Sequence, residues 1–305
     1  MVDRPTFSIV IAAHNAARTL PSTIRSVLAQ TVEDYEVVVV DDGSLDGTGD
    51  ALRQTSEDAR IRYLRQEQTG PAGARNAGIQ AATGSFVCLL DSDDLWLPTY
   101  LQAMADAFEA EPSASLGYTD AWRLDDRTRR IFRTTIMGTQ RSPENPPREH
   151  EALLVELLTR NFVYTSATVR RSVLIDVGGF QTFARSEDYE LWLRIAAAGH
   201  TFVRAPGLQA VYRDRPGSRI HDRRAMVEGR LEIYDFVLRT YELTRTARSV
   251  AEARLREAKK DLASLTDGTA IAEPKSLRRI VRDLRLFRTT VPREVARAFP
   301  DLHAV

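Results

Sequence analysis

Residues 37–48 read VVVVDDGSLDGT, a run of four valines that ends in two aspartates and a glycine. Such a run predicts a strand at residues 36–40 that is buried on both faces. Within residues 1–112, similar apolar runs predict three more strands, at 7–11, 61–64 and 85–90. Between them, apolar residues follow a helical spacing at 20–28, 74–82 and 101–108. Strands that alternate with helices predict parallel β-α-β units, and therefore an α/β fold whose ligands bind at the carboxyl ends of the strands.

Acidic residues follow two of the predicted strands. Asp41 and Asp42 come directly after the second strand, and Asp91, Asp93 and Asp94 come directly after the fourth. Because carboxylates confined to one crevice repel each other and raise each other's pKa, such a cluster favours a bound cation. Carboxylates at strand ends suit Mg²⁺ or Mn²⁺, which keep waters and bind phosphates through few protein ligands. The alternative interpretation is that these aspartates and glycines only form turns.

The composition excludes several classes of protein. The 305 residues include 42 Lys or Arg and 42 Asp or Glu, a net charge of +0 that argues against nucleic acid as the main partner. The longest apolar stretches, such as residues 86–90, are far shorter than the roughly 20 residues of a membrane-spanning helix. A single cysteine, Cys88, excludes an internal disulfide and fits a reducing compartment. The first residues make a poor signal peptide, so we expect a cytoplasmic protein.

The sequence pattern divides the chain into three parts. After the regular alternation of residues 1–112, residues 113–220 form a looser mixture, with strand-like stretches near 116–124, 131–136 and 163–169. Residues 221–305 are helical and rich in arginine. Their spacing predicts two packed helices or one interrupted coil, then a linker at 266–274 and a basic helix at about 276–287. The basic helix could lie on the inner face of an anionic membrane or dock on the rest of the protein. These C-terminal helices could also form a homodimer.

Five blocks of sequence follow one another in register. Four lie in the first part: SIVIAAHN at 8–15, VVVVDDGSLDGT at 37–48, GARNAG at 73–78 and LLDSDD at 89–94. The fifth combines Gly178, Gly179 and Phe180 with EDYELW at 187–192 and with Tyr212, Arg213 and Ser218. Together they resemble a family 2 glycosyltransferase of GT-A fold over roughly residues 6–220.

The resemblance implies a GT-A-like, Rossmann-type, mostly parallel sheet flanked by helices. In that fold, residues 1–112 would form the nucleotide-sugar-binding half and residues 113–220 the acceptor-binding half of the same domain. Residues 221–305 would be a helical C-terminal extension.

The resemblance also implies roles for the donor-binding residues. Ala12, His14 and Asn15 would line the base and ribose pocket, although the family more often has Pro and Tyr where Ala12 and His14 stand. Asp42 would accept a hydrogen bond from the N–H of a uracil-like base, and Arg75 would approach the nucleotide as a cation. At the Asp-X-Asp motif, Asp91 with Ser92 would contact the ribose, and Asp93, together with Asp91, would bind Mn²⁺ or Mg²⁺. An exposed arginine on a helix is the alternative interpretation of Arg75.

The remaining expectations concern the reaction itself. Arg213 and Arg215 would support the departing diphosphate, or be ordinary loop arginines. Asp188 would be the general base that takes the acceptor proton, with Glu187 supporting it or binding the acceptor. On position alone these two acids could simply stabilise a helix N-terminus. Direct in-line attack would invert the anomeric centre.

The implied activity is the transfer of one sugar from a nucleoside-diphosphate sugar, with UDP favoured. The hydroxyl acceptor would be a glycan, a glycolipid or a similar molecule, in bacterial surface polysaccharide or glycoconjugate assembly. The sequence lacks the Gly-X-Gly-X-X-Gly turn of a Rossmann dehydrogenase, the Gly-rich basic loop of a nucleotidyltransferase and the Gln-X-X-Arg-Trp motif of a processive synthase. A non-catalytic nucleotide-sugar-binding protein stays open as the alternative, because binding needs Asp42 and Asp93 but not Asp188.

Overall fold

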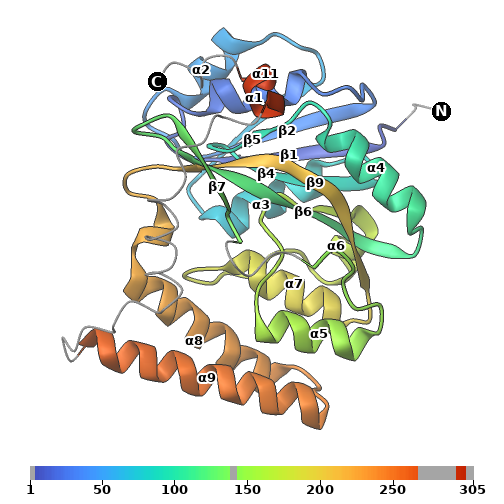
Figure 1. Ribbon diagram of the computed structural model, residues 1–305. Coiled ribbons are helices and arrows are strands. Elements are labelled where there is room, and N and C mark those ends of the chain that lie inside the picture. Colours follow the sequence, from blue (N-terminus) through green and yellow to red (C-terminus); the bar gives the residue numbers. More distant parts are fainter. Residues whose placement is uncertain (1–3, 138–142, 267–292, 300–305) are drawn as a thin grey trace.

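The computed structural model describes residues 4–137, 143–266 and 293–299. Its centre is one sheet of nine strands in the order β3-β2-β1-β4-β8-β6-β9-β5, with β7 paired to β6. Helices cover both faces of this sheet, and a pair of long helices extends from one end (Figure 1). The α/β fold expected from the sequence is confirmed.

The first four strands are parallel, and their register brings the acidic strand ends together. They are β1 (Phe7–Ala13), β2 (Tyr35–Asp42), β3 (Ile61–Gln66) and β4 (Phe86–Asp91). Ala13 of β1 lies opposite Asp41 on one side, and Ala12 lies opposite Asp91 on the other. Since side chains alternate across a sheet, each strand contributes to two cores. The valines of β2 illustrate this: Val37 and Val39 belong to one apolar cluster, and Val38 and Val40 to another.

Four helices connect and cover these strands: α1 (Leu20–Leu28), α2 (Thr48–Thr55), α3 (Pro71–Ala81) and α4 (Tyr100–Ala110). Helices α1 and α4 pack on the face that Ile9 and Ile11 enter. Helix α3 packs on the opposite face against β1 and β2. It comes very close to the sheet at Gly78, where a Cβ atom would lie 2.3 Å from Cγ1 of Val10. A glycine is therefore required there by the close approach of helix and strand.

The second half of the sheet is mixed. It consists of β5 (Leu95–Trp96), β6 (Ala114–Asp125), β7 (Arg130–Thr135), β8 (Thr168–Arg170) and β9 (Thr201–Asp214). Strands β6 and β9 are parallel, whereas β8 runs antiparallel to both β4 and β6, and β5 runs antiparallel to β9. The stretch expected to be a strand at 163–169 forms one only from Thr168, because the backbone before it makes a tight turn in which the Ala167 amide donates to the Thr165 carbonyl at 2.7 Å. Three helices cover this half: α5 (His150–Thr159), α6 (Arg171–Asp176) and α7 (Glu187–Ala197).

The C-terminal part contains a short 3₁₀ turn, η1 (Arg219–His221), and then a hairpin of two helices. These are α8 (Arg223–Thr240) and α9 (Arg245–Thr266), which pack against each other, and α9 also packs on α5. The two packed helices expected from the sequence are therefore present. A further helix, α11 (Arg293–Ala298), is drawn at the opposite end of the molecule from that hairpin (Figure 1). The predicted linker and basic helix at 266–287 lie almost entirely outside the described residues.

Candidate active site

The base-pocket residues expected from the sequence meet at the carboxyl ends of β1 and β2. Asn15 has a left-handed backbone (φ 49°), and its side-chain Oδ1 accepts from the Leu45 amide at 2.9 Å. This contact turns the Asn15 amide nitrogen toward Nε2 of His14, at 2.9 Å. Nε2 is therefore the acceptor, and Nδ1–H of His14 donates to the Asp42 carbonyl at 2.7 Å. The loops after β1 and β2 are joined by these side chains.

Asp42 anchors the loop that follows β3. Its Oδ1 accepts from the Thr69 amide and from Nε2 of Gln66, both at 2.8 Å, and its Oδ2 accepts from the Gly70 amide at 2.8 Å. The side chain is thus fixed at the strand end where a base would bind. Its role as the acceptor of a base N–H stays a prediction.

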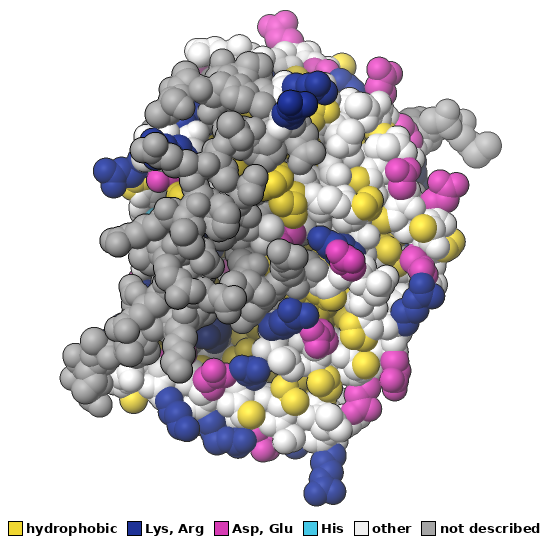
Figure 2. All heavy atoms as spheres, in the orientation of Figure 1, with side chains coloured by type: hydrophobic (Ala, Val, Ile, Leu, Met, Phe, Trp, Pro, Cys, Tyr) yellow, Lys and Arg dark blue, Asp and Glu magenta, His cyan; other side chains and the backbone are white. Residues whose placement is uncertain are grey.

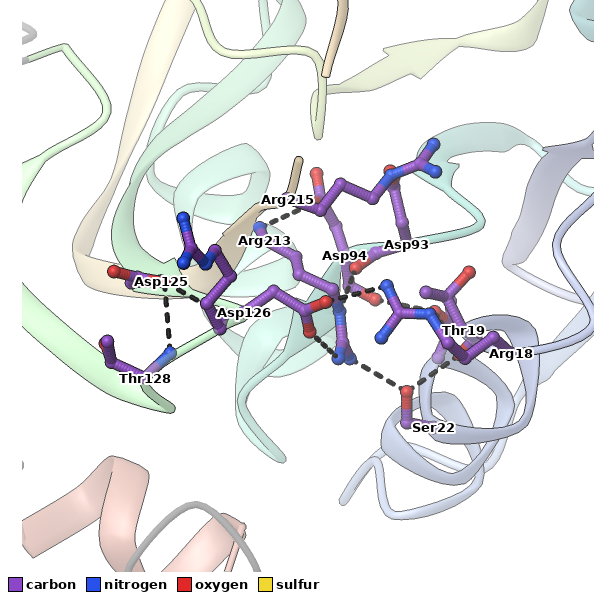
Figure 3. Close-up of polar contacts among 12 residues, drawn as sticks. Arg18, Thr19, Ser22, Asp93, Asp94, Asp125, Asp126, Thr128, Arg213 and Arg215 are labelled. Atoms are coloured by element: carbon purple, nitrogen blue, oxygen red, sulfur yellow. Dashed lines mark hydrogen bonds and ion pairs between the residues drawn. The ribbon is translucent and has the colours of Figure 1, made fainter. Parts of the chain in front are cut away.

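The turn at residues 91–94 carries three carboxylates in different environments. Asp94 is fully buried and accepts hydrogen bonds from the hydroxyl of Tyr164 and the amide of Arg213. Asp93 pairs with Arg215, whose Nε lies 2.6 Å from Oδ2 (Figure 3). Burial and the nearby Asp91 carboxylate raise the pKa of Asp93 despite this arginine. An additional positive charge beside Asp93 would therefore be favourable at this turn.

Arg75 joins the turn at residues 91–94 to the N-terminus of α7. Its Nη2 lies 2.7 Å from Oδ1 of Asp91, and its Nη1 lies 2.7 Å from Oε1 of Glu187 on α7. The guanidinium is buried and stacks over the ring of Phe180, at 5.3 Å from the ring centroid. Burial opposes its charge, but the two carboxylates outweigh that effect and raise the pKa of Arg75. The alternative of an exposed surface arginine is wrong for this residue.

Glu187 and Asp188 are adjacent in sequence, but their pKa values are shifted in opposite directions. Burial alone would raise the pKa of both carboxyl groups. For Glu187, the positive charges of Arg75 and Arg219 outweigh the effect of burial, so its pKa is lowered. For Asp188, burial and the neighbouring Glu187 raise the pKa, although the Thr165 hydroxyl donates to its Oδ2 at 2.8 Å. Pairs of acids with divergent pKa values are typical of acid–base sites. Asp188 is therefore the better proton acceptor of the two.

The two arginines predicted to support a diphosphate lie in different surroundings. The Arg213 side chain is 6% exposed and donates to the Asp93 carbonyl, to Ser22 and to Asp126. The Arg215 side chain is 41% exposed and pairs with the Asp93 carboxylate. Figure 3 shows Arg213 beneath the turn and Arg215 at its edge. Arg215 is thus the more accessible of the two, whereas Arg213 holds the backbone of the turn; the role of either at a diphosphate stays a prediction.

The model of the family described as "Glycosyl transferase family 2" matches residues 8–178, which is more than half of the chain. The chain belongs to this family. It is therefore a transferase, and the alternative of a non-catalytic binding protein is set aside.

Relatives of this glycosyltransferase occur in several bacteria. It is 32% identical over 258 residues to the succinoglycan biosynthesis protein ExoO of Rhizobium meliloti, covering 83% of this chain and 73% of the relative. It is 29% identical over 212 residues to the Escherichia coli UDP-Glc:alpha-D-GlcNAc-diphosphoundecaprenol beta-1,3-glucosyltransferase WfaP, covering 69% and 78%. A shorter match, 46% identical over 104 residues, spans 33% of this chain and 32% of an uncharacterized glycosyltransferase of Nostoc sp..

Solved structures of glycosyltransferases share the fold of this one. Staphylococcus aureus TarS in complex with UDP-GlcNAc superposes with a TM-score of 0.64 at 18% identity, covering 84% of this chain and 72% of that one. The mannosyltransferase PcManGT of Pyrobaculum calidifontis, in complex with GDP-Man and Mn²⁺, gives 0.62 at 19% identity, covering 99% and 85%. The GT-A fold expected from the sequence is confirmed.

The carboxylates at residues 91–94 of this glycosyltransferase suit a metal ion whose remaining ligands come from the substrate. Among the described residues, no three His, Cys, Asp or Glu side chains are grouped so that they could hold a metal by themselves. Asp91 and Asp93, however, keep their side chains 29% and 22% exposed, whereas Asp94 is buried. Mg²⁺ bound with nucleotides typically uses one or two carboxylates together with phosphate oxygens. Two partly exposed carboxylates suit that arrangement.

Three residues of the site were missed by sequence reasoning. Thr165 donates to Asp188, Tyr164 donates to Asp94, and Arg219 lies 3.6 Å from Glu187. Arg219 had a signal, because it stands in an arginine-rich stretch after Ser218. Tyr164 and Thr165 had none, since only the three-dimensional fold brings residues before β8 to the ends of β4 and α7.

Proposed function

We propose that this enzyme transfers single sugars from a nucleoside-diphosphate sugar, with UDP favoured, to a hydroxyl acceptor with inversion. The observation that carries the proposal is the Arg75 bridge. It connects Asp91, on the donor-binding turn, to Glu187, the immediate neighbour of Asp188, through two contacts of 2.7 Å. One buried side chain thus links the residues that would bind the donor and the residue that would activate the acceptor.

On the donor side, the loop residues Ala12, His14 and Asn15 would line the base and ribose pocket, with Asp42 accepting from the base. Asp91 and Ser92 would contact the ribose, and Arg75 would contribute its charge through Asp91. Asp93, with Asp91, would hold Mn²⁺ or Mg²⁺, which neutralises charge on the diphosphate when bound. Arg215, already beside Asp93, would add a second positive charge.

On the acceptor side, Asp188 would accept the proton of the attacking hydroxyl. The oxygen forms its bond to the anomeric carbon as the bond from that carbon to the diphosphate breaks, so configuration inverts. The electron pair leaves with the diphosphate, where positive charge stabilises it. Glu187 keeps Arg75 and Arg219 in place and raises the pKa of Asp188, which makes Asp188 a stronger base than an exposed aspartate.

Three similarities support the choice of substrate. WfaP is named for a UDP-glucose donor and a lipid-linked acceptor, and ExoO is named for succinoglycan biosynthesis. TarS was solved with UDP-GlcNAc. We therefore infer a role in bacterial surface polysaccharide or glycoconjugate assembly, with a glycan or glycolipid as the acceptor.

A thermal-shift panel tests the donor. Nucleoside diphosphates and nucleotide sugars are compared with and without Mn²⁺, and a ligand at 100 times its dissociation constant should add about 2.7 kcal/mol of stability. We expect the UDP series to give the largest shift, and to need Mn²⁺. A larger shift with another base would change the assignment of the donor. If none of the nucleotides shifts the melting temperature, that result would count against the proposal.

We also propose a cytoplasmic location with peripheral contact at the inner membrane face. The basic residues that suggested this contact lie at 275–288, outside the described residues, and none of the described helices has the length and apolar character needed to cross a bilayer. Deleting residues 273–305 should reduce binding to vesicles that contain anionic lipid, and unchanged binding would exclude this contact. A homodimer through the C-terminal helices is proposed alongside it and is tested by mass in solution.

A further inference from the structure

Three successive backbone carbonyls of the acidic turn, residues 91–94, are held by side chains from other elements. The hydroxyl of Thr23, on α1, lies 3.1 and 2.8 Å from the carbonyl oxygens of Ser92 and Asp94, which share its single proton. Arg213, at the end of β9, donates Nε–H to the carbonyl of Asp93 at 2.7 Å. The residue that would bind the metal is therefore positioned through its own backbone by an arginine 120 residues later in the chain.

Arg213 is itself fixed by Asp126, which lies after β6 in the turn toward β7 (Figure 3). The Asp126 side chain is 5% exposed, and its Oδ1 accepts from Nη1 of Arg213 at 3.1 Å. Its Oδ2 accepts from Arg18 at 2.7 Å, and its amide donates to the Asp214 carbonyl at 2.9 Å. Burial disfavours the charge of Asp126, but hydrogen bonds from Arg18 and Arg213 outweigh this and lower its pKa. Asp126 is thus an anion at neutral pH.

We propose that Asp126 is a positioning residue for the metal-binding turn: it orients Arg213, which in turn fixes the carbonyl of Asp93. The link to the metal rests on the proposed function of Asp93. Without the Asp126 carboxylate, Arg213 keeps its positive charge next to Asp93 and Asp94 and can rotate toward their carboxylates. It would then release the Asp93 carbonyl and compete with the metal ion for the same oxygens.

Hydrogen exchange of the backbone tests the positioning without any ligand. The amide of Asp94 donates to the Asp91 carbonyl at 3.1 Å and so reports the closure of the turn. In Asp126→Asn, exchange of the peptide that contains this amide should become about tenfold faster, because losing one charge-assisted hydrogen bond shifts a local opening equilibrium by about that factor. Equal exchange in Asp126→Asn and wild type would overturn the proposal.

Asp125→Asn is the matched control, since Asp125 precedes Asp126 in the same turn but contacts other groups. Its carboxylate accepts from the amides of Arg127 and Thr128, and an asparagine side chain can accept the same bonds. Exchange at Asp94 should stay at the wild-type rate in this variant. Acceleration equal to that of Asp126→Asn would show a general loosening of the turn and overturn the specific role of Asp126.

The second measurement is the Mn²⁺ concentration that half-saturates UDP binding in calorimetry. Asp126→Asn should raise it about tenfold, as loss of outer-shell partners does at metal sites, and Asp126→Glu should recover part of the loss. Faster exchange with an unchanged Mn²⁺ requirement would overturn the link to the metal. If wild-type protein binds no UDP with Mn²⁺, the proposed function fails, and the exchange comparison alone decides whether Asp126 positions the turn.

Ser22→Ala provides a second route if Asp126→Asn does not fold. Ser22 accepts from Nη2 of Arg213 at 2.8 Å, so this change removes another anchor of the same guanidinium without leaving a buried charge unpaired. We expect faster exchange at Asp94 here too, by a smaller factor. An unchanged rate in Ser22→Ala, when Asp126→Asn is unfolded, would overturn the proposal.

Discussion

Asp188 is the residue proposed as the general base. A hydroxyl is a poor nucleophile while protonated, and general-base assistance is typically worth about 10²–10⁴-fold. Asp188→Asn preserves the shape of the side chain and removes its ability to accept the proton. Turnover should therefore fall at least about a hundredfold, while the thermal shift with nucleotide sugar stays near that of wild type. Retained turnover in a folded variant would exclude this role, and Glu187 would be tested next.

The pH profile of kcat/KM reports the same carboxylate. In the proposed mechanism the reaction requires ionised Asp188, so activity should fall as pH drops through a pKa that lies above the ordinary 3.8. The Thr165 hydroxyl favours the ionised form, and Thr165→Val should therefore move the acidic limb to higher pH. Thr165→Ser keeps the hydroxyl and should leave the limb in place. Identical limbs in the Val and Ser variants would contradict the assignment.

Asp93 tests the use of a metal. Asp93→Ala should abolish transfer, because the diphosphate would then leave without the metal's charge beside it. Asp106→Ala, at an exposed position on α4, is the control and should keep wild-type activity. Full activity of the wild type in excess chelator would rule out metal assistance. Arg215 would then be the residue to test as the source of positive charge.

At the scale of elements, the packing of α3 on β1 can be tested at Gly78. There, helix propensity and core packing have opposite effects on the free energy of unfolding. Replacing a helical glycine with alanine ordinarily gains about 1 kcal/mol, but inserting a methyl group into a filled core costs about 1–3 kcal/mol. In Gly78→Ala the new Cβ would lie 2.3 Å from Cγ1 of Val10, which is fully buried, so the packing cost should dominate. Denaturant unfolding should show a net loss of about 1–2 kcal/mol.

A double variant shows whether this loss comes from that contact. Val10→Ala alone should destabilise by leaving a cavity, whereas Val10→Ala combined with Gly78→Ala refills it. The double variant should therefore lose less stability than the sum of the single changes. Additive losses would place the cost of Gly78→Ala elsewhere.

Elements with a regular pattern could be predicted from the sequence. The valine run of β2 and the apolar face of α1 each define their element locally. The acids at the ends of β2 and β4 lie at one edge of the sheet, on either side of β1, because parallel strands end at the same edge. The side-chain contacts that join these elements could not be predicted. Arg75 reaches Glu187 across 112 residues, and Arg213 reaches Ser22 across 191. No periodic pattern in the sequence indicates a contact between residues so far apart. The late start of β8 had no signal either.

At the scale of the whole molecule, the C-terminal helix α11 packs against the sheet near the acidic turn. Val295 is fully buried and belongs to one apolar cluster with Leu95, Leu97, Leu124 and Val211. Leu95 and Leu97 directly follow the turn that carries Asp93. Residues 293–299 therefore contribute to the stability of the region around the acidic turn, although they are far along the chain from it.

Truncating Val295 measures that contribution. Val295→Ala removes two buried carbon groups and should lower the unfolding free energy by about 1.5 kcal/mol. In a chain of this size, Tm should fall by about 2–5 °C in a thermal scan. Arg297→Ala, at an exposed position on the same helix, should leave Tm unchanged. An unchanged Tm in Val295→Ala would show that α11 adds no stability through this contact.

The bond from Arg213 to Asp93 also sets an order of events during protein synthesis. By the time β4 has left the ribosome, the four parallel strands are available, but the arginine that fixes the acidic turn lies 120 residues further on. At about 5–20 residues per second, the turn waits about 6–24 s for that residue. During this interval its aspartates lack the counter-charges of Arg213 and Arg215. The acidic turn therefore receives these counter-charges only when β9, the last described strand to be made, and the residue after it are synthesised, although the turn itself is made early.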